Sequence, residues 1–357
     1  MAMEWPQLLA PWITPELVLD NWRERIDRVA AEESAYVAGL PYVKGVAIIG
    51  SVGRGTHWPI SDVDLLVAAD CWDGQDPEGL IQAEEKQRNQ KLHAAGVPND
   101  LEAGNWVVQP HELASAVTAD DDAFFCKLDH PHWVGIVIKA PGARVVRDFD
   151  GQVRQLLDRC ESVLFGDRFV HLWLRRATDD VSRKLASAAA LMRAGDWSCA
   201  SLDVLVAADW MTGAMYALWR KLPQSISRGA SRLLAAAREA GDQDLGELFL
   251  VAARLDEDAV RGRFAAVPPA GRRERDVWLA IRQGAGEDVD ALAATRDLLY
   301  VSWRVLHVSG DRHSADPYPE WTGVTNHEAT VRTQLEAAAE ILRRLQSAKT
   351  QLVGNWS

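Results

Sequence analysis

Residues 50–70 read GSVGRGTHWPISDVDLLVAAD, and this stretch decides the fold. It starts directly after an apolar, β-branched run at residues 43–49 (VKGVAII) and ends in a second apolar run at residues 62–69 (DVDLLVAA). Short runs of this composition, bounded by glycine and polar residues, are typical of β-strands. The segment between them is too short for a domain and long enough for a tight loop with a helical turn. The sequence therefore predicts two strands joined by a glycine-rich loop.

Two aspartates open the second of these strands. Asp62 and Asp64 are two positions apart, so both carboxylates leave the same face of the sheet, next to each other. Two negative charges so close are unfavourable unless cations bridge them. Carboxylate oxygens are hard ligands that suit Mg²⁺, and two metal ions can clamp the attacking and leaving oxygens of a phosphoryl displacement. We therefore predict that these two residues are catalytic and bind Mg²⁺, with two ions in the site.

The glycine-rich loop supplies groups that suit a phosphate. Gly50 lets backbone N–H groups approach a phosphate closely, and the hydroxyl of Ser51 adds a donor. Arg54 either adds positive charge at the same place or pairs with a carboxylate of the fold. Such loops are frequent, but a loop placed shortly before a same-face acidic pair is far less so. These three residues are predicted to bind a nucleotide.

Together these features resemble the signature of the DNA polymerase β-type nucleotidyltransferases, a superfamily that includes the antibiotic nucleotidyltransferases. The resemblance rests on Gly50-Ser51, on the Gly53-Arg54-Gly55 segment, and on SDVDLLV at residues 61–67. It implies an α/β (α+β) domain with a mixed sheet flanked by helices, followed by an α-helical bundle. It also implies Mg²⁺ and an NTP co-substrate, with ATP favoured.

The resemblance further implies a third carboxylate on a later strand, which completes the metal site or acts as general base. A helix is expected at residues 79–95 and a third strand at residues 101–108. Asp100 and Glu102 share one face of this strand, so both are candidates. Aminoglycoside adenylyltransferases with an α-helical second domain carry a similar Leu-Glu pair there. Leu101-Glu102 resembles it, which favours Glu102 and leaves Asp100 open.

The rest of the first half is predicted to alternate between helices and strands. A helix should begin at Pro15, after the N-cap Thr14, and continue to residue 38. Residues 134–138 (VGIVI) and 144–146 indicate a later strand or hairpin, with Pro141-Gly142 at its turn.

The character of the chain changes after Gly151, where long amphipathic helices replace the β-branched runs. Helices are expected at residues 169–192, 201–222, 231–240, 245–259, 289–308 and 327–348. We therefore divide the chain into a nucleotidyltransferase domain, residues 1–150, and an α-helical substrate-binding domain, residues 151–357. In the resembling enzymes, basic residues of the helical domain reach the triphosphate. Arg183 and Lys184 are candidates for that role, against the alternative of a solvated face paired with Asp179 or Asp180.

Composition and charge limit the possible partners. Lys and Arg total 39 against 51 Asp and Glu in 357 residues, a formal net charge of −12, so the average surface repels polyanions. This balance argues against a dedicated nucleic-acid binder and suits a cationic substrate. The four cysteines form no zinc-ligand pattern, and no apolar run is long enough for a signal peptide or a membrane span. We expect a cytoplasmic protein without membrane contact; its oligomeric state is left open.

These observations support one leading hypothesis and two alternatives. The leading hypothesis is transfer of a nucleoside monophosphate, with AMP from Mg-ATP favoured, to a hydroxyl of a small molecule. An aminoglycoside-type antibiotic is one candidate acceptor, which would make antibiotic resistance the biological role. The first alternative keeps the chemistry but has a protein side chain or an RNA end as acceptor. The second is a non-catalytic binding or antitoxin module that retains the fold, and the presence of both aspartates argues against it.

Overall fold

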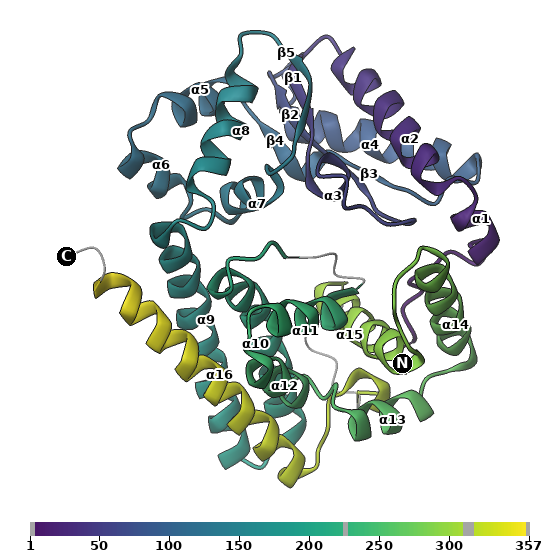
Figure 1. Cartoon of the computed structure of the whole chain (residues 1–357), viewed down its shortest axis with the longest axis vertical. Helices are drawn as coiled ribbons and strands as arrows, with labels where there is room; N and C mark the ends of the chain where they lie inside the picture. The colour runs from purple at the N-terminus through teal and green to yellow at the C-terminus, as the bar shows by residue number, and fades with distance from the viewer. Residues whose placement is uncertain (1–3, 224–227, 310–317, 355–357) are drawn as a thin grey trace. The chain divides into compact units, whose positions relative to one another are not determined.

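The computed structural model describes residues 4–223, 228–309 and 318–354 (Figure 1). It divides into two compact units, one formed by Ile13–Gly166 and the other by Met1–Trp12 together with Asp167–Ser357. Across the described residues, no helix combines the length and the apolar character that crossing a bilayer requires. The predicted fold class, a mixed sheet flanked by helices and followed by a helical region, is confirmed.

The first unit, which we call the α/β unit, is built on a mixed sheet with the strand order β3-β2-β1-β5. Strand β2 pairs antiparallel with β1 and parallel with β3 and β4, and β1 pairs antiparallel with β5. The central strand β2 is buried along its whole length, which explains its continuous apolar sequence. The strands are β1 (Val43–Ile48), β2 (Val63–Ala69), β3 (Leu101–Glu102), β4 (Val107–Val108) and β5 (Arg144–Asp148).

Helices pack against this sheet and complete the core of the α/β unit. Helix α2 packs on β1, β2 and β5, while α4 packs on β3 and β4. The core gathers inward-facing residues of α2, β1 and β2. The helices are α1 (Pro15–Leu19), α2 (Trp22–Ala38), α3 (Gly50–Gly53), α4 (Pro77–Ala94), α5 (Pro110–Thr118), α6 (Asp121–Lys127), α7 (Pro131–Lys139) and α8 (Gln152–Val163).

Two predicted elements of the α/β unit are interrupted. The helix expected from Pro15 to residue 38 breaks into α1 and α2, because Asn21 adopts a left-handed conformation with φ 43°. Asparagine tolerates this conformation better than most residues. The strand expected at residues 101–108 is split into β3 and β4 by the 3₁₀ turn η1 (Gly104–Trp106). Both strands still pair with β2, so the chain keeps its place in the sheet.

The strand predicted at residues 134–138 is wrong, because this segment lies in helix α7. His130 caps the helix and Pro131 occupies its first turn. The buried positions Trp133, Ile136 and Val137 follow helical spacing, so one face of a short helix buries the apolar run that resembles a strand. The second part of the predicted hairpin is correct, since residues 144–146 lie in β5.

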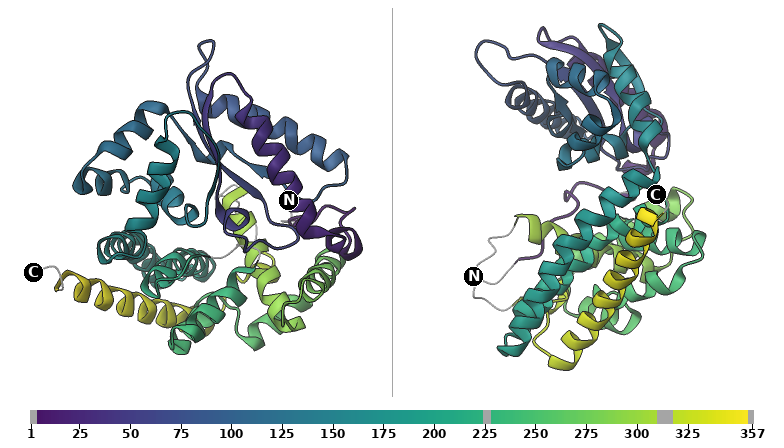
Figure 2. Two further views of the ribbon diagram at one scale, coloured as in Figure 1. Left: turned by 45° about the horizontal axis from the view of Figure 1, so that its top comes forward. Right: turned by 90° about the vertical axis from the view of Figure 1, so that its left-hand side faces the viewer.

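The second unit, which we call the helical unit, consists of α-helices around a large apolar core. The long helices α9, α10 and α16 pack alongside one another (Figures 1 and 2). The helix predicted at residues 245–259 ends early, because Arg254 adopts a left-handed conformation with φ 53°, and α14 was not predicted. The helices are α9 (Asp167–Arg193), α10 (Trp197–Leu218), α11 (Gly229–Glu239), α12 (Gln243–Ala252), α13 (Glu257–Ala265), α14 (Pro269–Gly284), α15 (Ala291–Ser309) and α16 (Glu328–Gly354).

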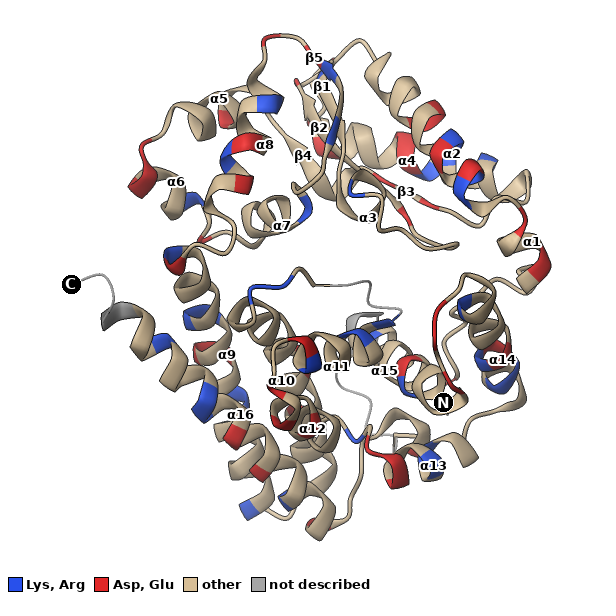
Figure 3. Cartoon of the chain, in the orientation of Figure 1, with Lys and Arg blue, Asp and Glu red and all other residues tan. Residues whose placement is uncertain are grey.

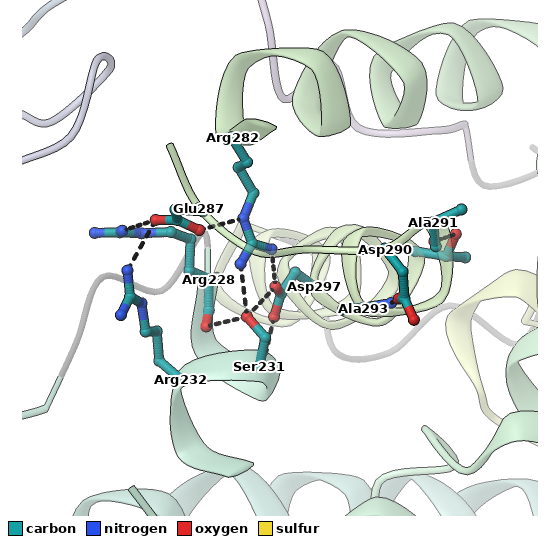
Figure 4. A network of polar contacts seen from close by, with 10 residues as sticks. Arg228, Ser231, Arg232, Arg282, Glu287, Asp290, Ala291, Ala293 and Asp297 are labelled. Atoms are coloured by element: carbon teal, nitrogen blue, oxygen red, sulfur yellow. Dashed lines mark hydrogen bonds and ion pairs between the residues drawn. The ribbon is translucent and has the colours of Figure 1, made fainter. Parts of the chain in front are cut away.

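A network of buried charges joins α11, α14 and α15 in the helical unit (Figure 4). The guanidinium of Arg282 lies 2.6 Å from the carboxylate of Asp297, which is fully buried, and 2.7 Å from that of Glu287. Ser231 donates to Asp297 over 2.5 Å, and Arg228 pairs with Glu287. Each buried charge therefore has a partner of opposite sign, and the cost of burying it is offset only while the network is intact.

Candidate active site

The sheet brings Asp64 and Glu102 side by side. Strands β2 and β3 run parallel, with Val63 opposite Leu101 and Asp64 opposite Glu102. The amide of Val63 donates to the carbonyl of Asp100 over 2.7 Å and holds this register. Aligned residues of neighbouring strands present their side chains on the same face, so the two carboxylates are adjacent. Asp64 is buried at 5% exposure, and Glu102 is about one-third exposed at 33%.

Asp62 and Asp100 lie just outside the strands on the same edge of the sheet. Asp62 precedes β2 and is exposed to solvent. The Oδ1 atom of Asp100 lies 2.7 Å from Nε2 of His93, near the end of α4. Of the two candidates for the third carboxylate, the structure thus pairs Glu102 with Asp64 and Asp100 with a histidine.

Burial and neighbouring charges shift the pKa values of Asp62, Asp64 and Glu102. The pKa of Asp62 is raised to about 7. The main cause is loss of hydration, since many protein atoms surround the carboxylate even though part of the residue is exposed. The charges of Glu102 and Asp100 add to the effect. Burial raises the pKa of Asp64 to about 7 as well, against the attraction of a nearby lysine. Burial also acts to raise the pKa of Glu102, but the hydrogen bond with Asp64 and the lysine outweigh it and lower that pKa overall. Loss of hydration is therefore the main reason why both aspartates keep their protons to a higher pH than usual, and the charge of Glu102 adds to it.

The lysine in question is Lys139, the last residue of α7. Its Nζ donates to Oδ1 of Asp64 and lies 3.5 Å from Oε2 of Glu102. The same ammonium lies over the ring of Trp106, 4.7 Å from the ring centroid. A positive charge thus occupies the place between the two carboxylates.

Gly50 forms the wall of the site behind Asp64. Its backbone has a φ of +69°, and a Cβ at this position would lie 2.1 Å from Oδ2 of Asp64. The amide of Ile49 donates to the carbonyl of Asp64 over 3.0 Å, which brings the loop and the strand together. Only glycine meets both demands, so the first residue of the loop is shaped around the second aspartate.

A comparison with protein-family models matches the part of the chain that contains Asp62, Asp64 and Glu102. Residues 35–102 match the family model of a nucleotidyltransferase domain. The match spans β1, the Gly50 loop, β2 and β3, and it ends at Glu102. No curated protein and no solved structure matches the chain significantly. The match supports nucleotidyl transfer as the general chemistry of this region.

The region that matches the family model also contains the residues predicted to bind phosphate. Gly50 and Ser51 begin the short helix α3, and Arg54 caps its end. The Nη1 atom of Arg54 is buried and has no hydrogen-bond partner among the described residues. Burial lowers the pKa of Arg54, and the charge of Asp64 acts in the opposite direction. A buried guanidinium nitrogen without an acceptor is a suitable donor for an anion.

The carboxylates of Asp62, Asp64 and Glu102 form a donor set that suits a divalent metal, because carboxylate oxygens are the ligands that such metals prefer. With the side chains as they stand, residues 4–223, 228–309 and 318–354 contain no group of three His, Cys, Asp or Glu side chains arranged to hold a metal. In this arrangement the ammonium of Lys139 contacts Asp64 and lies 3.5 Å from Glu102. The residues fit a metal ion once the ammonium moves away.

Several residues that the sequence analysis did not single out position this site. Asn99 is fully buried and donates to the carbonyls of Pro59 and Ser61 over 3.1 and 3.0 Å, which fixes the chain just before Asp62. Asn105 donates to Oε1 of Glu102 over 3.0 Å. The amide of Asn99 needs these partners because it is buried, and that burial is visible only in the structure.

Lys139 was missed because its segment was assigned to a strand. The apolar positions 133, 136, 137 and 140 follow a helical period, and His130-Pro131 is a helix start. Read as a helix, the segment ends in a lysine at its carboxyl end, where a positive charge is favoured.

The two basic candidates of the helical unit are paired within that unit. Arg183 donates to Asp180, and its side chain is exposed. The Nζ atom of Lys184 lies 2.7 Å from Oδ1 of Asp203 on α10. Basic and acidic residues are interspersed along α9 and α16 (Figure 3).

Proposed function

We propose that the chain transfers a nucleoside monophosphate from an NTP, with ATP favoured, to a hydroxyl group of a small molecule. The observation that carries this proposal is the register of β2 and β3, which aligns Asp64 with Glu102 next to Asp62. The match of residues 35–102 to a nucleotidyltransferase domain supports the same chemistry. Pyrophosphate is the second product, since the bond broken lies between the α- and β-phosphates.

Asp62, Asp64 and Glu102 are the residues that would hold Mg²⁺, with two ions as the working hypothesis. When bound, the metal supplies charge neutralisation for the phosphates and for the entering and leaving oxygens. Gly50, through its backbone, and the hydroxyl of Ser51 would bind the outer phosphates. The unpaired Nη1 atom of Arg54 supports an additional contact with the nucleotide.

Glu102 would accept the proton of the acceptor hydroxyl. Its pKa is lowered, so it is ionised at neutral pH, and Asn105 orients one of its oxygens. A general base must be charged and within hydrogen-bond reach of the proton that it removes. Asp100 is the alternative base, and its interaction with His93 makes it the weaker candidate.

The helical unit would select the acceptor, and Arg183 and Lys184 on it would assist nucleotide binding. The formal net charge of −12 favours a cationic acceptor over a polyanion such as RNA. Aminoglycosides fit this description because their amino groups are protonated at neutral pH. The role in antibiotic resistance and the cytoplasmic location belong to the same proposal.

A mass-spectrometric screen tests the proposal. Purified protein is incubated with Mg²⁺, each of the four NTPs in turn, and a panel of aminoglycosides, lincosamides, proteins and RNA. We expect an adduct heavier by one nucleoside monophosphate on one class of small molecule, with release of pyrophosphate. Asp62→Asn and Asp64→Asn should abolish both signals.

The same screen separates the alternatives. An adduct on protein or RNA would keep the chemistry and replace the acceptor, and RNA binding would also weaken steeply with added salt. Absence of nucleotide binding, together with identical behaviour of wild type and Asp62→Asn in every assay, would contradict the enzyme and leave a non-catalytic module.

A further inference from the structure

A lysine occupies the carboxylate cluster where the proposed function requires a divalent cation. The Nζ atom of Lys139 donates to Oδ1 of Asp64 and lies 3.5 Å from Oε2 of Glu102. Its side chain is 26% exposed, so the ammonium sits inside the cluster with one side open to solvent. A metal ion bound to these oxygens would compete with the ammonium for them, and the two positive charges would repel each other.

The position of this lysine depends on Trp106 and Gly135. The ammonium lies 4.7 Å from the centroid of the Trp106 ring. Gly135 comes four residues before Lys139 on α7, so both lie on one face of the helix. A Cβ at Gly135 would lie 2.5 Å from Cζ3 of the ring, so the glycine allows the indole to pack closely against α7. The helix thus places a tryptophan and a lysine together at the cluster.

The surroundings of Lys139 limit where its ammonium can go. If a metal ion takes its place, the ammonium keeps the favourable interaction with the indole face but loses both carboxylates. A bound nucleotide would compensate for this loss, because its phosphate oxygens would replace the two carboxylates as partners of the ammonium. Lysine suits this exchange, since its ammonium is a compact charge on a flexible stem and a common phosphate ligand.

We propose that Lys139 couples metal binding to nucleotide binding: it pairs with Asp64 and Glu102 in the metal-free protein and with phosphate oxygens of the nucleotide in the loaded protein. The inference rests on the proposed function, because it needs the carboxylates to be metal ligands. It has a direct thermodynamic consequence. A metal ion alone binds weakly because it must displace the ammonium, and nucleotide strengthens metal binding by the same factor by which metal strengthens nucleotide binding.

Titration of the full-length chain with Mn²⁺, followed by electron paramagnetic resonance, tests the proposal without any turnover. The titration is run alone and with an ATP analogue in which a carbon atom bridges the α- and β-phosphates. Lys139→Met removes the charge and keeps an unbranched side chain, and Lys139→Gln repeats the test with a polar end. Lys127→Met is the matched control, since Lys127 lies over the ring of Trp133 at 5.5 Å in the same unit. A thermal melt of each variant confirms that it is folded.

We expect both Lys139 variants to bind Mn²⁺ alone about tenfold more tightly than wild type, and the gain in Mn²⁺ affinity from the analogue to shrink by a similar factor, within the usual range of coupling energies. Lys127→Met should match wild type in both titrations. Wild type that binds Mn²⁺, combined with folded Lys139 variants of unchanged affinity and unchanged coupling, would overturn this inference and leave the proposed function intact. Wild type that binds no Mn²⁺ with or without the analogue would overturn both.

Discussion

Replacing Gly50 with alanine tests the construction of the site more directly than removing a carboxylate does. Gly50 and Gly55 lie in the same loop with almost the same backbone conformation, φ +69° and +71°. They differ in what an added Cβ would meet. At Gly50 it would lie 2.1 Å from Oδ2 of Asp64, while at Gly55 nothing lies within 4 Å. Gly55→Ala is therefore a matched control for the conformational part of the change.

The two substitutions share one cost and differ in another. An L-residue in the left-handed region costs about 1–2 kcal/mol, so both variants should melt several degrees lower. Gly50→Ala must in addition move the Asp64 carboxylate by more than an ångström to restore van der Waals contact. A displacement of about 1 Å in a catalytic group costs roughly 100-fold in rate. We expect kcat/KM to fall by about that factor in Gly50→Ala and to stay near wild type in Gly55→Ala.

Three measurements on both variants check this expectation: the melting temperature, the Mn²⁺ affinity and the rate of pyrophosphate release. We expect similar melting temperatures for the two variants and a large difference in metal affinity and rate. Equal metal affinity and equal rate in the two variants would refute it, because Asp64 would then not depend on the glycine for its position.

Three further predictions follow from the same geometry and from the helical unit. Glu102→Gln should lower kcat/KM by about 10²- to 10⁴-fold, as expected for a general base, while Asp100→Asn stays close to wild type; the reverse order would make Asp100 the base. Because burial raises the pKa of Asp64 from 3.8 to about 7, Mn²⁺ affinity should fall as pH drops below 7, and the metal-free α/β unit should lose stability as pH rises from about 4 to about 7; a pH-independent titration and melt would contradict this. Asp297→Ala leaves Arg282 buried without its closest partner and should destabilise the helical unit by about 3–5 kcal/mol in a denaturant titration. The exposed ion pair between Arg261 and Glu257 in the same unit is the control, and Arg261→Ala should leave that titration nearly unchanged.

The strands, the loop and the acidic pair of the site depend on local sequence, and they could be predicted from it. Strands β1 and β2 followed from their β-branched runs, and the order of loop, acidic pair and later carboxylate followed from the motif. The pairing of Glu102 with Asp64 did not follow, because the register of two parallel strands depends on packing between them. The sequence left Asp100 and Glu102 as alternatives. The hydrogen bond from the amide of Val63 to the carbonyl of Asp100 sets the register that places Glu102, and not Asp100, opposite Asp64.

Lys139 shows where sequence reasoning failed for a physical reason. The run at residues 134–138 is apolar and β-branched, and such short runs do not distinguish a buried strand from a buried helix. Its helical conformation is decided by the burial of one face against the α/β unit and by the cap before it. The position of the lysine over Trp106 then depends on Gly135, whose importance appears only when the ring lies on the helix. Contacts between segments distant in sequence determine each of these features.

The charges of the cluster connect its protonation to its proposed chemistry. Asp62, Asp64 and Glu102 outnumber the two cationic groups near them, Lys139 and Arg54, so the fully ionised cluster keeps an excess of negative charge. In the metal-free protein burial raises the pKa of both aspartates, and the negative charge of Glu102 adds to the rise. A divalent metal would satisfy the same excess and release those protons. Because the charge of Glu102 raises the pKa of both aspartates, Glu102→Gln should weaken metal binding and also lower both pKa values, while burial keeps them above the ordinary value. A pH titration of the two aspartates in wild type and in Glu102→Gln measures this change.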